Sequence, residues 1–238
     1  MGGAPGLLLA ALCTLLPDDP PHRGTPTASS GYREVWAIPT FRLITLAGAA
    51  MTFALGGFAV WMPTFFHRAW GLSVEQAGML FGGVTVIAGL TGSLLGGWLA
   101  DALRARNSHA DLLVSGAGLL AGMPLAALAI AAPGLRSSVA ALFLAEMLLF
   151  LNMGPLNSAI VAVTRLETRS MAFAANIFVI HLLGDAASPT LIGWASDLFG
   201  LTRALLASCL ALGVGGALCF LARGAFDTDA ARAAGASS

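Results

Sequence analysis

The stretch AGMLFGGVTVIAGLTGSLLGGWLA, residues 77–100, holds 24 consecutive residues without an ionisable side chain. A helix needs about 20 apolar residues to cross the roughly 30 Å hydrocarbon core of a bilayer, so this stretch is long enough to span one. Because lipid offers no hydrogen-bond partner to a free backbone N–H or C=O group, the stretch is predicted to be helical. It ends in Gly97-Trp98-Leu99-Ala100-Asp101, a motif that returns later in the chain.

Five further apolar runs share this character: Leu43–Phe66, Leu112–Leu135, Ser137–Thr164, Ser170–Ser196 and Ala204–Ala222. The chain as a whole is 57% apolar and only 10% charged, against roughly 25% charged residues in soluble proteins, and its mean hydropathy is +0.83. All twelve basic residues are arginines, and twelve acidic residues balance them. We therefore predict an all-α integral membrane protein of six transmembrane helices, without the net charge that recruits nucleic acid.

The segments outside the six runs set the expected organisation. Pro5–Leu16 is too short to span at about 1.5 Å per residue, so residues 1–16 are interpreted as the remnant of a preceding transmembrane helix. Residues 17–42 are expected to be a cytoplasmic linker, 43–222 the six-helix domain and 223–238 a disordered cytoplasmic tail. With six spans, both termini lie on the same side of the membrane as the second and fourth loops. The segments on that side contain nine arginines, and those on the other side contain three. Because cytoplasmic segments carry the excess of positive residues, both termini are predicted to be cytoplasmic, in a bacterial inner membrane.

The Gly-Trp motif recurs as Gly193-Trp194-Ala195-Ser196-Asp197, 96 residues after the first copy. Each copy closes the middle helix of a triple. Because three is an odd number, the two copies should lie on opposite membrane faces, which makes an inverted-topology repeat of the kind found in secondary transporters. A chance match of three residues is the alternative.

Only three charged or titrating polar residues fall inside the six runs: Glu146, His181 and Asp185. A carboxylate at mid-bilayer costs at least ~2.5–3.5 kcal/mol, so each is a functional candidate. On the fourth run, Glu146, Met153 and Asn157 share one helical face, and Gly154-Pro155 interrupts the helix.

His181 precedes Asp185 by four residues, and the pair admits three interpretations: a proton or cation coupling site, an interhelical hydrogen bond that fixes packing, or a direct contact with substrate. Glu146 is a further coupling candidate. The three cysteines share no ligand spacing, so no metal and no cofactor is expected. An enzyme is disfavoured because a Gly-x-Ser-x-Gly elbow, a His-Glu-x-x-His pair and a cysteine near His181 are all missing from the sequence.

The residues from Gly97 to Arg106 resemble the loop motif of the major facilitator superfamily, Gly-x-x-x-Asp followed by arginine. The string His181-Leu182-Leu183-Gly184-Asp185-Ala186-Ala187-Ser188-Pro189 is similar to the spinster subfamily. That superfamily has twelve helices in two six-helix halves, so the resemblance implies that this chain is the C-terminal half, helices seven to twelve.

The resemblance also implies roles for individual residues. The first helix of each triple would line a central substrate pathway, formed by Phe58, Trp61, Met62, Glu146, Met153 and Asn157. A small or lysolipid-like amphipathic solute suits such walls. Gly97, Asp101 and Arg104 would form a conformational latch, with Asp101 beside the N-terminus of the fifth helix near Ser170.

These inferences predict a secondary active transporter of the spinster type that works by alternating access, with proton coupling as a further hypothesis. The second wall of the pathway must come from a partner, either an N-terminal six-helix half or a second copy of this chain, within membrane lipid. The chain is therefore a truncated product, a separately encoded half or a self-associating half. A non-transporting membrane scaffold or partner subunit is the alternative function.

Overall fold

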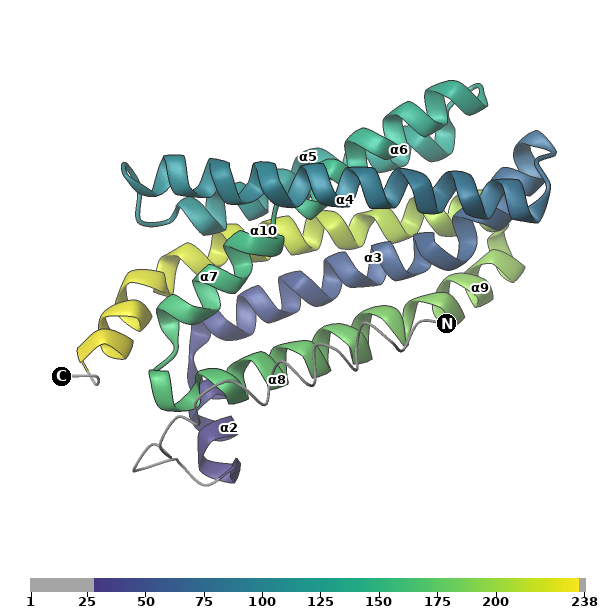
Figure 1. The fold of residues 1–238 in the computed structure, drawn as a ribbon. Helices are drawn as coiled ribbons and strands as arrows, with labels where there is room; N and C mark the ends of the chain where they lie inside the picture. The colour runs from purple at the N-terminus through teal and green to yellow at the C-terminus, as the bar shows by residue number, and fades with distance from the viewer. Residues whose placement is uncertain (1–27, 236–238) are drawn as a thin grey trace, which may run out of the picture.

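The computed structural model describes residues 28–235, and every regular element within them is helical (Figure 1). A short helix, α2 (Ala28–Ala37), precedes six segments that are long and apolar enough to cross a membrane. The first three of them are single helices: α3 (Pro39–Trp70), α4 (Val74–Arg104) and α5 (Ala110–Ala131). The six predicted spans and the all-α fold are confirmed.

The fourth and fifth spans are less regular, whereas the sixth is again a single helix. The fourth is divided into α6 (Leu135–Phe150) and α7 (Met153–Val163). The fifth begins with the turn η1 (Leu166–Thr168) and continues through α8 (Arg169–Ile180), the π-helical segment η2 (His181–Asp185) and α9 (Ser188–Phe199). The sixth is α10 (Leu201–Gly235).

Local signals explain the tight reversal between α3 and α4. Gly71 ends α3 with a φ of 68°, a left-handed conformation that glycine adopts without steric cost. Ser73 then starts α4 with a capping box: its hydroxyl accepts the N–H of Gln76 at 3.1 Å, and the Gln76 side chain accepts the N–H of Ser73 at 3.0 Å.

The inverted repeat is present in the structure. The first triple is α3, α4 and α5, and the second consists of the three later spans. The C-terminal ends of α4 and α9, which carry the two Gly-Trp motifs, lie at opposite ends of the bundle (Figure 1). The two motifs therefore lie on opposite faces, as the odd number of helices requires.

The six spans differ sharply in how much of their surface the bundle covers. In the central apolar windows of α3, α5, α6–α7 and α10, 44–50% of the residues are buried, against 17% in α4 and 11% in the fifth span. The core contains Phe41, Phe66 and Leu205 among its fully buried side chains. Two whole spans thus present mostly exposed, apolar surfaces.

The break between α6 and α7 follows from Pro155. Proline has no N–H, so the carbonyl of Leu151 lacks its usual partner four residues on. Gly96 of α4 packs directly against this carbonyl, where a Cβ would overlap the oxygen. The side-chain amide of Asn152 donates to the carbonyl of Leu149 at 2.6 Å and to Sδ of Met51 in α3 at 2.8 Å. Neighbouring helices therefore cover the break.

The structure differs from expectation at both segments that were predicted to be cytoplasmic. Residues 28–37 and 39–42, expected as linker, are helical, and α10 continues to Gly235 where a disordered tail was expected. The reason is a tertiary contact: the N–H of Thr40, in the first turn of α3, donates to Oδ2 of Asp229 at 3.0 Å, and Asp229 is buried. The predicted helix remnant and the first part of the linker, residues 1–27, lie outside the described residues.

The close approach of Gly96 to the helix break predicts a position-specific sensitivity. Gly96→Ala should lower stability by about 1–3 kcal/mol, because the added Cβ collides with the Leu151 backbone. Gly97→Ala is the matched control, since a Cβ there meets nothing within 4 Å. Thermal unfolding in detergent measures both; equal midpoints for the two variants would contradict the packing described.

The Asp229 contact predicts a local effect at the start of α3. Asp229→Ala should cost about 1 kcal/mol, because it removes the carboxylate that accepts a first-turn N–H. Asp229→Asn, which keeps an acceptor oxygen, should lose less. Hydrogen exchange measures the effect: amides of residues 40–43 should exchange faster in Asp229→Ala, and unchanged exchange there would rule out the cap.

Candidate functional site

A cavity of about 400 Å³ lies between α3, α7 and the fifth span. Apolar side chains from all three elements form most of its wall. The polar residues in the wall are Thr52, Asn152, Asn157, Asn176, His181 and Asp185. The fold therefore brings the polar residues of the fourth and fifth spans into one place, mostly within apolar surroundings.

His181 and Asp185 are held by an irregular stretch of helix. The N–H of Ala186 donates to the carbonyl of His181 at 2.9 Å, which is the i→i−5 bond of a π-helix. Nδ1 of His181 lies 2.5 Å from Oδ2 of Asp185, and the two side chains are 60% and 44% exposed. π-Bulges are rare and occur frequently at functional sites.

Small residues on α3 allow the π segment to approach closely. Gly48, Thr52 and Gly56 are spaced four residues apart and so lie on one face. A Cβ at Gly56 would lie 2.7 Å from Oδ1 of Asp185 and 2.9 Å from Oγ of Ser188, and one at Gly184 would lie 2.7 Å from Cβ of Thr52. Sequence reasoning missed this face; small residues at every fourth position were the available signal.

Ser188 contributes a second polar group beside the pair. Its side chain is fully buried, and Oγ has no hydrogen-bond partner in the described residues. Oγ of Ser188 and the Asp185 carboxylate both lie against Cα of Gly56, which carries no side chain. The Asp185 carboxylate therefore has one oxygen on His181 and the other at a junction with α3 and Ser188.

The predicted pathway residues of the fourth span divide into two groups. Met153 and Asn157 line the cavity, and the side-chain amide of Asn157 donates to the carbonyl of Met153 at 2.7 Å. Glu146 does not line the cavity: it is fully buried in α6. The expectation of a shared face is wrong because helical spacing holds only along a continuous helix, and α6 ends before Met153.

Glu146 instead lies inside the bundle. Neither carboxylate oxygen has a hydrogen bond within the described part of the chain, and the buried hydroxyl of Thr85 in α4 has none either. A buried carboxyl group without such partners is costly in its ionised form. The structure therefore separates Glu146 from the cavity and from the His181–Asp185 pair.

The predicted pathway residues of α3 also lie elsewhere. Phe58 and Met62 are 1% and 0% exposed and belong to the hydrophobic core, so their assignment to the cavity wall is wrong. Trp61 is partly buried; its indole N–H donates to the carbonyl of Pro189 at 3.0 Å, and its ring lies against Gly193. The face of α3 that reaches the cavity is the one with Gly48 and Thr52.

Two of the residues predicted to form a latch, Asp101 and Arg104, belong to an ionic group at the C-terminal end of α4. Nη1 of Arg104 lies 2.7 Å from Oδ1 of Asp101, and Nη2 lies 2.7 Å from Oδ1 of Asp111. The Asp111 side chain is only 7% exposed, whereas that of Asp101 is 72% exposed. Asp101 thus bonds within its own helix, where a contact near Ser170 was expected. Asp111, seven residues after Arg104, was not recognised from the sequence.

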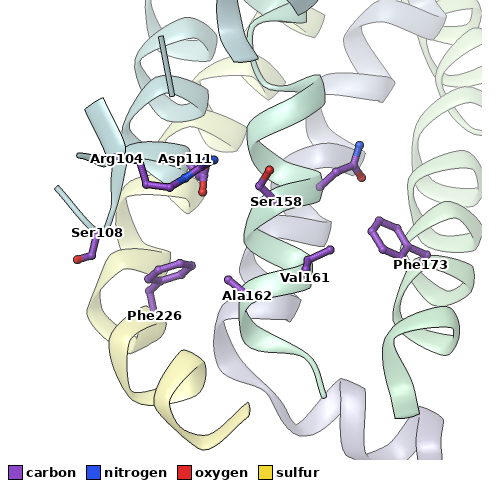
Figure 2. A pocket seen from close by; sticks show the side chains of 9 residues that line it. Arg104, Ser108, Asp111, Ser158, Val161, Ala162, Phe173 and Phe226 are labelled. Atoms are coloured by element: carbon purple, nitrogen blue, oxygen red, sulfur yellow. The ribbon is translucent and has the colours of Figure 1, made fainter. Parts of the chain in front are cut away.

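A pocket of about 590 Å³ adjoins this group (Figure 2). Arg104 and Asp111 lie together on one side of it, Ser158 and Ala162 of α7 line its centre, and Phe173 of α8 lies on the far side. Gly97 is not in the wall of this pocket; it faces the start of α7, where a Cβ at Gly154 would lie 3.8 Å from its Cα. Within the described residues, no cluster of three or more His, Cys, Asp or Glu could hold a metal ion.

Comparison with known proteins agrees with this architecture. The family model of the Major Facilitator Superfamily matches residues 1–182 of the sequence. Protein spinster homolog 1 of Xenopus laevis is 34% identical in an alignment of 218 positions that covers 81% of this chain and 41% of that protein. A sphingosine-1-phosphate transporter of Danio rerio is 32% identical over 166 residues, covering 64% of this chain and 33% of the relative.

A solved structure supports the same fold. The bacterial homologue of the human lysosomal transporter spinster, in an inward-facing and unoccupied conformation, superposes with a TM-score of 0.80 at 22% identity. The match covers 95% of this chain and 58% of that one. The chain thus spans about two fifths of the length of the first spinster relative and little more than half of the solved structure. It belongs to the major facilitator superfamily and, within it, to the spinster-like proteins.

Proposed function

We propose that this chain forms one six-helix half of a secondary transporter that moves an amphipathic, lipid-like solute by alternating access. The observation that carries the proposal is the cavity between α3, α7 and the fifth span. Its walls are largely apolar, as an acyl chain requires, and a few amide groups with the His181–Asp185 pair offer hydrogen bonds to a headgroup. The name of one relative, a sphingosine-1-phosphate transporter, supports the same class of solute.

The second wall of the pathway would come from another six-helix unit. Substrate sites in this class of fold lie between two halves related by an axis along the membrane normal. The mostly exposed surfaces of α4 and the fifth span offer apolar area for such a partner, either an N-terminal half or a second copy. The arginine distribution supports cytoplasmic termini in a bacterial inner membrane.

Coupling to protons would use His181 and Asp185. The two side chains are close, partly exposed to the cavity and placed where the helix is irregular. Histidines and carboxylates inside membrane spans commonly form proton relays in transporters, and π-bulges are frequent at functional sites. Glu146, which lies apart from the cavity, is the second coupling candidate.

The ionic group at Arg104 would act as the latch between conformations. Asp101 pairs with Arg104 here, and the adjoining pocket separates Arg104 from Phe173 of α8. Closure of this pocket would bring α8 toward Asp101, whose charge suits a helix N-terminus. Gly97 would allow α7 and α4 to move closer together during this closure, because glycine places no side chain between the two helices.

The cavity predicts where a solute can be blocked. Met153→Trp should weaken binding of a fluorescent lysophospholipid by about tenfold or more, because Met153 is 45% exposed and lines the cavity. Leu144→Trp is the matched control on the same span, 44% exposed and outside the cavity. Titration of the purified chain measures both. Equal affinities, or no saturable binding to the wild type, would support the scaffold alternative.

The polar pair predicts a loss of proton dependence. In reconstituted vesicles, uptake of a labelled lysophospholipid should respond to an imposed proton gradient, and His181→Gln and Asp185→Asn should each abolish that response while exchange without a gradient remains. Asp197→Asn, an exposed carboxyl group at the end of α9, should keep the response. If both cavity variants respond to the gradient as the wild type does, the pair is not the coupling site.

A further inference from the structure

A second apolar hollow, separate from the central cavity, lies between α4 and the first half of α6. Its volume is about 680 Å³, and its walls include Met79, Gly83 and Ile87 of α4 and Phe143 of α6. We refer to it as the α4–α6 groove. It lies at the end of the bundle where α5 turns into α6, opposite to the end that carries Arg104.

The groove is open to the surroundings of the bundle. Met79 and Ile87 are 65% and 57% exposed, although both belong to a helix that is apolar enough to span a membrane. Its volume falls within the roughly 300–1,000 Å³ typical of sites for small organic ligands. At membrane depth, hydrocarbon rather than water is the medium that can fill such a space.

Arg136 is the charged residue in the wall of this groove. It stands in the first turn of α6, and no acidic residue lies in that turn. No ion pair involving Arg136 is found among residues 28–235, whereas Arg104, Arg165 and Arg232 each pair with a carboxylate. An arginine at the membrane edge extends its guanidinium toward the polar interface. The groove therefore combines a long apolar wall with one unpaired cation.

We propose that the α4–α6 groove binds a phospholipid of the surrounding bilayer, with its anionic headgroup at Arg136 and one acyl chain along α4. The charge pattern selects this occupant, since guanidinium recognises phosphate and the remaining wall is hydrocarbon-like. A packed protein helix would leave Arg136 without a counterion unless it supplied an acid at that depth.

The bound lipid would join the two triples at this end of the molecule. α4 belongs to the first triple and α6 to the second, and they diverge enough here to leave the groove. Toward the break they pack directly, through Gly92 of α4 against the Met147 backbone. A phospholipid would therefore fill the part of the contact that protein leaves open. This inference does not depend on the proposed transport function.

The experiment is a titration of the purified chain with phosphatidylglycerol and, separately, phosphatidylcholine, followed by native mass spectrometry. Gly83→Phe fills the groove without disturbing the fold, because a Cβ at Gly83 meets nothing within 4 Å. Gly78→Phe is its control on the same helix, equally free of contacts and outside the groove wall. Arg136→Gln removes the charge, and Arg203→Gln does so at the same end of the bundle, at the start of α10.

The wild type should bind one phosphatidylglycerol more tightly than phosphatidylcholine. Gly83→Phe should lose this bound lipid, and Arg136→Gln should weaken phosphatidylglycerol by about fivefold and lessen the preference over phosphatidylcholine. Gly78→Phe and Arg203→Gln should match the wild type. Wild-type binding by Gly83→Phe, or equal weakening by Arg203→Gln, would overturn the proposal in favour of non-specific lipid around the bundle or a groove reserved for another protein segment.

Discussion

Backbone polar groups in hydrocarbon must find partners within the protein, because lipid offers none. Regular helices meet this constraint by themselves. The two irregular spans meet it with local hydrogen bonds of their own, and neighbouring helices pack closely over the interruptions. The break between α6 and α7 exposes the carbonyl of Leu151, which Gly96 covers, and Asn152 bonds the carbonyl of Leu149 and reaches Met51. Around the π segment, Gly56 of α3 and Gly184 allow equally close contact. Glycine is required at these places because any side chain would separate the helices.

The same two irregularities place the polar residues. A continuous fourth span would align Glu146 with Asn157, whereas the break buries the first in the bundle and leaves the second at the cavity. In the fifth span, the π turn sets His181 against Asp185 and presents both beside α3. Irregular backbone at membrane depth is tolerated where it is buried in protein or lines a cavity, and both conditions are met here. The candidate site is thus a consequence of how the helices are interrupted.

The distribution of exposed surface shows what kind of unit this is. α3, α5 and α10 hold the core together, while α4 and the fifth span keep large apolar areas uncovered. Both uncovered spans are the middle helices of their triples, so the inverted repeat governs exposure as well as topology. A membrane or a second six-helix unit can cover such surfaces. The charged groups at the Arg104 end, including the Asp229 contact with α3, fasten the helix termini to one another.

The sequence by itself determined the membrane class, the six spans, the opposite placement of the two Gly-Trp motifs and the family, because length, apolarity and short motifs depend only on local order. The pairing of His181 with Asp185 was predictable for the same reason: four residues make one helical turn. Only the tertiary structure decided that Phe58, Met62 and Glu146 are buried away from the cavity, that Asp111 shares Arg104, and that Asp229 orders the C-terminal helix. Those outcomes depend on helix phase across a break and on contacts between residues far apart in the chain, which hydrophobic periodicity does not encode.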